Sequence, residues 1–205
     1  MKPANWLFEQ SLWNQGYRYV CGVDEVGRGA WAGPVVSAAV VFPPKIKFPQ
    51  SLFDSKLLLP QKREELSSII QHLAAYIGIG VIGVSDINRR GIGVASQMSY
   101  LQAIKKLPQV PDYFLVDAFY VKYLPKLKQL PIVKGDQISA SIAAASIVAK
   151  VFRDQIMREL HVSLPRYRFD LHKGYGTKQH QKLITKHGFS EIHRRSFNLD
   201  YLVNS

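Results

Sequence analysis

The sequence predicts an α/β protein in which a mixed β-sheet is flanked by helices. Two observations support this class. Short apolar runs of strand length occur together with longer segments of helical periodicity. Three of the apolar runs also lead into acidic residues, which is typical of a sheet that carries polar chemistry at one edge. With 205 residues, the chain is long enough for one sizeable core and a small appended subdomain.

Three apolar runs early in the chain suit a meander of strands. They cover residues 19–23, 33–42 and 75–84. The segment 42–49 is rich in proline, which excludes pairing as a central strand, so we expect a surface loop there. A short helix should follow over residues 60–74.

The second half of the chain favours helices. Residues 86–106 carry an apolar stripe at helical spacing. Two further strands are expected near 113–117 and 130–133. A second long helix, over about 139–160, is rich in alanine, whose small side chain permits close packing against a sheet.

The last part of the chain differs in composition from the rest. Beyond residue 160 it becomes polar, basic and aromatic, and we interpret it as a helical lobe beside the active site. We therefore expect a catalytic core over residues 1–160 and a C-terminal lobe over 161–205, packed together as a single domain.

Acidic side chains follow three of the expected strands. Asp24 and Glu25 come after the first run, while Asp117 and Asp136 come at the ends of the fourth and fifth. Clustered carboxylates repel one another, and a hard cation such as Mg²⁺ removes this repulsion. The sequence therefore predicts a carboxylate cluster that binds a divalent cation at one edge of the sheet.

Each acid also has an ordinary interpretation. Asp24 and Glu25 could form an exposed acidic turn, Asp117 could end a strand, and Asp136 could cap the helix that begins near Ser139. Neighbouring strand residues point to opposite faces, so two acids in tandem need a local kink to converge. Nearby glycines can supply such a kink. Three strands that all end in acids argue against coincidence.

The net charge of the chain indicates which class of substrate the carboxylate cluster acts on. Lys and Arg number 27 against 15 Asp and Glu, which gives a net charge of +12. Such a balance favours a polyanionic partner. A basic body around an acidic pocket suggests phosphodiester chemistry, with the basic surface binding phosphates and the pocket holding metal ions. The alternative is a basic protein whose charges are merely solvated.

Cysteine content and hydropathy predict the compartment. Cys21 is the single cysteine of the sequence, so neither an internal disulfide nor a cysteine zinc site can form. The N-terminal segment lacks the pattern of a secretory signal. The longest apolar stretches of the chain, 33–42 and 76–84, are well short of the roughly 20 residues that span a bilayer. We expect a cytoplasmic protein without membrane contact.

Six blocks of the sequence form a recognisable series. In chain order they are Asp24-Glu25-Val26-Gly27-Arg28-Gly29, Asp54-Ser55-Lys56, Leu115-Val116-Asp117, Lys134-Gly135-Asp136 with residues 143–150, Lys173-Gly174-Tyr175-Gly176-Thr177, and His193-Arg194-Arg195-Ser196-Phe197. Together they strongly resemble the ribonuclease HII family, in whose order they occur between about residues 18 and 197, so the resemblance covers nearly the whole chain. Arg28 stands where the sister type, ribonuclease HIII, usually has threonine, so type HII fits better.

The resemblance implies a ribonuclease H-like fold with a five-stranded mixed sheet. It also implies an endoribonuclease that hydrolyses the RNA strand of RNA–DNA hybrids and cuts 5′ to single ribonucleotides embedded in duplex DNA. The products would carry 5′-phosphate and 3′-hydroxyl ends, and the reaction would remove misincorporated ribonucleotides. By motif match, the catalytic and metal-binding carboxylates are Asp24, Glu25, Asp117 and Asp136, which would bind two Mg²⁺ or Mn²⁺ ions. A monomer is expected.

The resemblance also implies the contacts to substrate. Gly27, Arg28 and Gly29 would read the 2′-hydroxyl that distinguishes RNA from DNA. Tyr175 would pack on the sugar, a buried core tyrosine being the alternative. The remaining expected contacts are Lys56, to a phosphate, and His180, which together with His193 should face the substrate.

Two departures from the family and two rival functions also follow from the sequence. Leu57 stands where relatives commonly have a second lysine, and residues 198–202 differ from the usual end. An oxidoreductase is a remote alternative, because the segment 91–93 lacks the third glycine of a dinucleotide fingerprint. A non-catalytic nucleic-acid binder would explain the charge but would leave the strand-terminal acids without a role.

Overall fold

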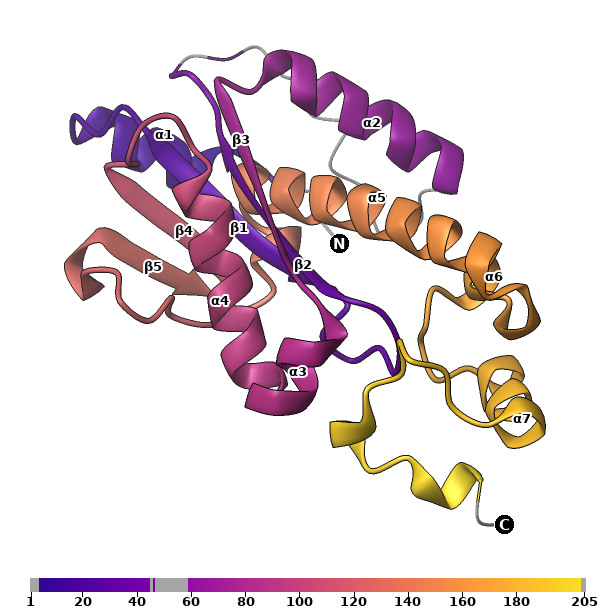
Figure 1. The fold of residues 1–205 in the computed structure, drawn as a ribbon. Helices are drawn as coiled ribbons and strands as arrows, with labels where there is room; N and C mark the ends of the chain where they lie inside the picture. The colour runs from indigo at the N-terminus through magenta and orange to yellow at the C-terminus, as the bar shows by residue number, and fades with distance from the viewer. Residues whose placement is uncertain (1–3, 45, 47–58, 204–205) are drawn as a thin grey trace.

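A five-stranded mixed sheet forms the centre of the protein (Figure 1). The computed structural model describes residues 4–44, 46 and 59–203. The strand order is β3-β2-β1-β4-β5. The strands are β1 (Val20–Val26), β2 (Val35–Val41), β3 (Tyr76–Ile82), β4 (Tyr113–Asp117) and β5 (Gln129–Ile132). The predicted mixed sheet is confirmed.

The pairing of the strands brings two predicted acids to one edge. β2 pairs with β1 and β3 in antiparallel fashion, whereas β4 runs parallel to both β1 and β5. Val23 of β1 pairs with Val116 of β4. The next residues along these parallel strands are Asp24 and Asp117, which therefore lie side by side where the pairing of β1 with β4 ends.

Helices cover both faces of the sheet (Figure 1). α5 packs on β1 and β2 from one side, with α2 against its outer face, and α4 packs on β3 and β2 from the other. The helices are α1 (Leu7–Asn14), α2 (Pro60–Leu73), α3 (Val84–Arg90), α4 (Ile92–Lys105), α5 (Ala140–Ser163), α6 (Phe169–His172) and α7 (Lys178–His187).

The interior strand β2 is buried on both faces, as its largely apolar sequence requires. Val36, Ala38 and Val40 pack among the alanines of α5, while Ala39 and Val41 pack against Tyr100 of α4. Successive side chains of a strand point to opposite faces, so one strand contributes to two cores.

Small residues allow α5 to approach the sheet closely. A Cβ atom at Gly22 would lie 2.1 Å from the backbone carbon of Ser141, so a larger residue would push the helix away. The helix begins at Ser139, whose hydroxyl accepts a hydrogen bond from the Ile142 amide. Asp136 therefore is not the cap of this helix, and the ordinary interpretation of that acid is wrong.

The main differences from the expected elements are the end of β1, the division of residues 86–106 and the presence of α1. β1 continues to Val26 because its pairing with β2 continues to Val36, so Asp24 and Glu25 lie within the strand. The segment 86–106 forms two helices, because Gly91 adopts φ 79° and separates α3 from α4. Helix α1 was not expected. Its buried Glu9 accepts hydrogen bonds from both hydroxyls of Ser139 and Ser141 at 2.6 Å, which ties α1 to the start of α5.

Short helices and turns make up the C-terminal part of the chain, drawn in yellow at the lower right of Figure 1. Ile184 of α7 packs with Leu199, Leu202 and Trp31, so this part is anchored to the loop after β1. The expected division at residue 160 stays a prediction, and α5 runs through it to Ser163. Within the described ranges, no helix is long and apolar enough to cross a membrane.

Candidate active site

Asp24 lies at the centre of the acidic edge. Its side chain is almost completely buried, with the residue 5% exposed. Burial raises the pKa of Asp24 well above its usual range, and the negative charge of Asp117 raises it further. A hydrogen bond from Ser146 of α5 opposes this shift. The carboxylate form of Asp24 therefore needs a positive partner.

Glu25 lies between a cation and an anion. Burial raises its pKa, while the guanidinium of Arg28 acts in the opposite direction with Nη1 3.3 Å from Oε1 of Glu25. The charge of Asp117 again raises the pKa. Asp24, Glu25 and Asp117 are thus close enough for their negative charges to repel one another.

Asp136 lies on a turn that is fixed to the end of β4. The Gly135 amide donates a hydrogen bond of 2.7 Å to Oδ1 of Asp117, and Asp136 follows in the single 3₁₀ turn Gly135–Gln137. A Cβ atom at Gly135 would lie 2.6 Å from Cδ1 of Ile142, so a larger residue would require the Ile142 side chain to shift. The fourth predicted acid therefore lies on the turn that is hydrogen-bonded to the third.

Carboxylate oxygens are the donors that hard divalent cations prefer. The raised pKa values of Asp24 and Glu25 show negative charge that the protein itself leaves poorly compensated. In the part of the chain that the structure describes, no group of three or more His, Cys, Asp or Glu side chains is arranged so that it could hold a metal ion. The acids thus have the chemistry for a cation without forming a closed ligand set.

The segment Gly27-Arg28-Gly29 leaves β1 beside these acids. Gly27 is buried with φ +93°, and a Cβ there would lie 2.1 Å from Nε of Arg153. Gly29 is exposed, and a Cβ there would meet nothing within 4 Å. The first glycine is thus required by packing, whereas the second faces open space that a ligand can enter. Arg28 is exposed, with its guanidinium carbon 5.0 Å from the centre of the Phe119 ring.

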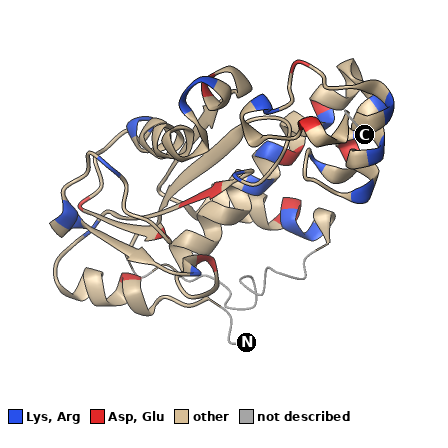
Figure 2. Cartoon of the chain, turned by 90° about the horizontal axis from the view of Figure 1, so that it is seen from below, with Lys and Arg blue, Asp and Glu red and all other residues tan. Residues whose placement is uncertain are grey.

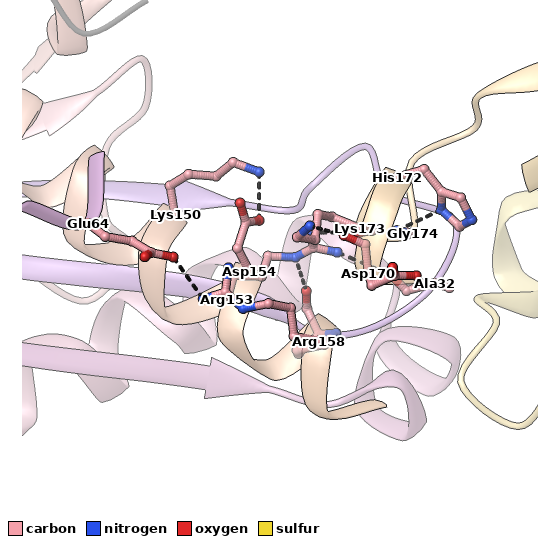
Figure 3. Close-up of polar contacts among 11 residues, drawn as sticks. Ala32, Glu64, Lys150, Arg153, Asp154, Arg158, Asp170, His172, Lys173 and Gly174 are labelled. Carbon is pink, nitrogen blue, oxygen red and sulfur yellow. Dashed lines mark hydrogen bonds and ion pairs between the residues drawn. The ribbon is translucent and has the colours of Figure 1, made fainter. Parts of the chain in front are cut away.

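Arg153 of α5 is a residue to which the sequence assigned no role. It is fully buried and donates hydrogen bonds to three backbone carbonyls (Figure 3): Nε to Pro34 (2.9 Å), Nη2 to Ala32 (3.1 Å) and Nη1 to Lys173 (3.0 Å). Burial lowers its pKa. Its spacing of four residues from Ala149 and Met157, which both lie on the buried face of the helix, is the signal that could have identified it.

Arg194 holds the same loop from the other side. It is fully buried, and it donates from Nε to the Gly33 carbonyl at 3.0 Å and from Nη1 to the Arg28 carbonyl at 2.9 Å. Burial lowers the pKa of Arg194 to about 9. Two buried arginines therefore fix the backbone that follows β1, including the carbonyl of Arg28 itself.

Tyr175 lies next to this loop through their shared contact with Arg153. The guanidinium carbon of Arg153 lies 5.2 Å and Nζ of Lys150 lies 5.6 Å from the centre of the Tyr175 ring. Lys150 is held by Asp154 at 2.7 Å (Figure 3). The ring is half-buried, so the interpretation of Tyr175 as a fully buried core residue is wrong.

The expectation that His180 and His193 face the substrate is wrong. Both are buried, and their Nε2 atoms lie 3.0 Å apart. Nδ1 of His180 lies 3.0 Å from the Tyr175 carbonyl, so both ring nitrogens of His180 have protein partners. Burial lowers the pKa of His180 to about 3 and that of His193 to about 4. These histidines are therefore neutral supports beneath Tyr175. Lys56 and Leu57 lie outside the described residues.

Proteins of a known family are similar to this chain in sequence. A family model described as Ribonuclease HII matches residues 21–200. The chain is 48% identical over 194 residues to Ribonuclease HII of Herpetosiphon aurantiacus, covering 92% of this chain and 93% of the relative. It is 44% identical over 194 residues to Ribonuclease HII of Dehalococcoides mccartyi, covering 94% of this chain and 92% of the relative.

Solved structures share the fold. The ribonuclease H2 of Pyrococcus horikoshii matches with a TM-score of 0.70 at 24% identity, over 88% of this chain and 94% of that one. A ribonuclease HIII, Bst-RNase HIII in complex with Mn²⁺, matches with a TM-score of 0.65 at 20% identity, over 84% of this chain and 63% of that one.

Proposed function

Because the chain belongs to the ribonuclease HII family, we propose that it is a metal-dependent endoribonuclease that cuts 5′ to single ribonucleotides embedded in duplex DNA as well as within RNA–DNA hybrids. Ribonuclease H activity itself follows from membership of the family. The proposal adds the cut at a lone ribonucleotide, the 5′-phosphate and 3′-hydroxyl ends, and a role in removing misincorporated ribonucleotides.

The mutual repulsion of Asp24, Glu25 and Asp117 is the observation that carries this proposal. Burial raises the pKa of Asp24 and Glu25, so these two carboxyls together with Asp117 fit divalent cations, and Asp136 on the adjoining turn completes the proposed set. These four residues would hold two ions, Mg²⁺ or Mn²⁺. When bound, such ions supply activation of the attacking water and stabilisation of the departing 3′ oxygen.

The protein's own part in selectivity is to present backbone to the 2′-hydroxyl. The open space at Gly29 supports a close approach of the Gly27-Arg28-Gly29 backbone to the sugar. Arg194 would keep this segment in place through the Arg28 carbonyl. Tyr175, held against Arg153, would pack on the sugar, and Lys56 would contact a phosphate.

The charge of the molecule supports a nucleic-acid substrate. The net charge is +12, and Lys and Arg gather on the segments around the C-terminal end (Figure 2). Basic side chains bind a phosphate backbone largely by releasing counterions, which is independent of sequence. We propose that the protein binds hybrids and ribonucleotide-containing duplex DNA as a monomer.

An endonuclease assay tests the proposal. The substrate is a labelled DNA duplex that contains one ribonucleotide, incubated with Mg²⁺, Mn²⁺ or EDTA, beside an all-DNA duplex and an RNA–DNA hybrid. We expect metal-dependent cutting on the 5′ side of the ribonucleotide and an intact all-DNA duplex. Tight duplex binding without cutting in either metal would instead favour the non-catalytic binder.

A further inference from the structure

A recess lies beside Arg28, on the side of the acidic edge that faces α4. Its volume is about 670 Å³, within the range of roughly 300–1,000 Å³ that is usual for ligand pockets. We call it the aromatic pocket. Its distinctive lining consists of three aromatic side chains and three cationic ones: Phe119, Tyr120, Tyr123, Arg28, Arg90 and Lys122.

The aromatic side chains of this pocket are exposed to solvent. The exposed fractions are 52% for Phe119, 49% for Tyr120 and 87% for Tyr123. Three large rings on one short segment would normally be buried, because burying each aromatic side chain is strongly favourable. Their grouping around a recess therefore marks a binding surface.

The segment that carries the rings is held rigidly. Gln97 of α4 donates to the Tyr120 carbonyl at 3.1 Å and accepts from the Lys122 amide at 2.7 Å. The buried Gln129 of β5 accepts from the Val121 amide at 2.8 Å. Ala118 and Tyr123 bracket the segment with φ values of 58° and 72°, which residues with a Cβ rarely adopt. Such held backbone strain occurs preferentially at functional sites.

The charges around the pocket favour an anion. Among the described residues that line it there are three cations and no carboxylate. Arg28 and Arg90 contact acids that lie outside the lining, Glu25 at 3.3 Å and Asp86 at 3.4 Å. Flat aromatic faces with cations at the rim fit a ligand that has both a planar ring and a phosphate.

We propose that the aromatic pocket binds an unpaired nucleotide of a nucleic-acid strand, with its base on the tyrosine rings and its phosphate near Lys122 or Arg90. A base inside a duplex has both faces covered by its neighbours, so only an unpaired base can present a face to these rings. Phe119 lies two residues beyond Asp117 and contacts Arg28, which in turn contacts Glu25, so the pocket lies beside the acidic edge. The identification of the anion as nucleic acid rests on the proposed function.

Replacements of Tyr123 test the pocket. Fluorescence anisotropy would measure the affinity of Tyr123→Ala, Tyr123→Leu and Tyr123→Trp for a labelled six-nucleotide single-stranded DNA in EDTA. Loss of one stacked base corresponds to about a 5- to 100-fold loss of affinity, which we expect for Ala and Leu but not for Trp. All three replacements carry a Cβ, as Tyr does, so they share the backbone strain at this position. Tyr201→Ala, at an exposed tyrosine outside the pocket, is the matched control and should bind as wild type does.

The outcomes separate the pocket from the proposed activity. Leu binding as tightly as Tyr, or Trp binding as weakly as Ala, would overturn a stacking role. The same proteins would be assayed for cutting of a blunt duplex with one ribonucleotide, in which no nucleotide is unpaired at the ends. Cutting by wild type together with unchanged single-strand affinity in all Tyr123 variants would reject the pocket alone. Absence of cutting by wild type, with the affinity loss present, would reject the proposed function alone.

Discussion

At the scale of single residues, Asp117 connects the features of the acidic edge. Its charge raises the pKa of both Asp24 and Glu25, and its Oδ1 accepts the hydrogen bond that fixes the turn carrying Asp136. An amide at this position would keep the shape and an acceptor oxygen while removing the charge. Cation binding and backbone geometry can therefore be separated there.

We expect Asp117→Asn to reduce cleavage by at least about 100-fold, which is the scale of losing one transition-state contact. Duplex affinity should stay within about 3-fold, because the basic surface is unchanged. Cleavage rates at saturating protein and anisotropy with an uncut duplex in EDTA would measure the two effects. Asp200→Asn removes the same charge from an exposed acid and should leave cleavage unaltered. Equal loss in both variants would contradict a special role for Asp117.

Replacing Tyr175 distinguishes a role in positioning the substrate for cleavage from a role in binding the duplex. Its ring rests against Arg153 and Lys150, beside the glycine loop. We expect Tyr175→Ala to slow cleavage at a lone ribonucleotide by about 10- to 100-fold, with a much smaller change in duplex affinity, because the ring would position the sugar. Tyr175→Phe keeps the ring and should stay within about 3-fold of wild type. Parallel losses of rate and affinity in Tyr175→Ala would argue against positioning.

At the scale of elements, the sequence predicted the strands better than their ends. The acids could be predicted because each follows an apolar run that forms a strand. The end of β1 could not be predicted in this way, because Asp24 and Glu25 remain in the strand through their pairing with Ala38 and Ser37 of β2. Pairing partners lie outside any local window of sequence. The separation of α3 and α4 was readable in principle, because Gly91 interrupts the helical stripe.

Arg153 shows what local composition misses. An arginine within an alanine-rich helix suggests a solvated side chain, and only the folded chain reveals that three carbonyls from two loops converge on it. The same holds for His180, whose position in a basic segment suggested a substrate contact. Tertiary packing, rather than local composition, decides the environment of both residues.

We expect Arg153→Lys to destabilise the protein by about 2 kcal/mol, because an ammonium group cannot reach three carbonyls as a guanidinium does. For a chain of this length, that corresponds to a fall of about 4–8 °C in Tm. Cleavage should fall as well, since the glycine loop loses its support. Arg158→Lys is a matched control on the same helix (Figure 3), because Arg158 is partly exposed and pairs with Glu64 at 3.0 Å. Its Tm should change by less than about 2 °C. Calorimetry would measure the Tm of both variants. A comparable fall in both would contradict the stabilising role of Arg153.

The histidine pair under Tyr175 should make stability depend on pH. The folded-state pKa values of about 3 for His180 and about 4 for His193 lie below the ordinary value of 6.5. Unfolded chains therefore bind more protons between these values, so their contribution to stability is complete above about pH 6.5 and is lost as the pH falls towards 4. Thermal melts from pH 7 to pH 4.5 should show this loss, and His180→Asn should show a smaller one. His72→Asn, at an exposed histidine of α2, should follow wild type. Identical pH profiles for all three proteins would contradict the linkage.

At the scale of the whole molecule, net charge was the most informative property of the composition. The excess of Lys and Arg gives +12, while the four acids of the candidate site lie at one edge of the sheet. We expect duplex affinity to fall with salt, with a slope of log K against log salt near −0.9 for each phosphate contacted. Anisotropy titrations from about 50 to 200 mM salt in EDTA would measure the slope. An affinity that does not depend on salt would contradict binding through the basic surface.

The parallel pairing of β1 with β4 also governs when the site can form. Asp24 and Asp117 are 93 positions apart (117 minus 24), and the strands between them pair only with their neighbours on the other side. During synthesis, the emerging chain can build the β1–β2–β3 meander early, but this meander carries no complete acidic edge. The edge closes only after β4 has left the ribosome and found β1, a distant pairing of the kind that slows folding. The buried acids Asp24 and Glu25 thus meet Asp117 only after more than half of the chain has been made.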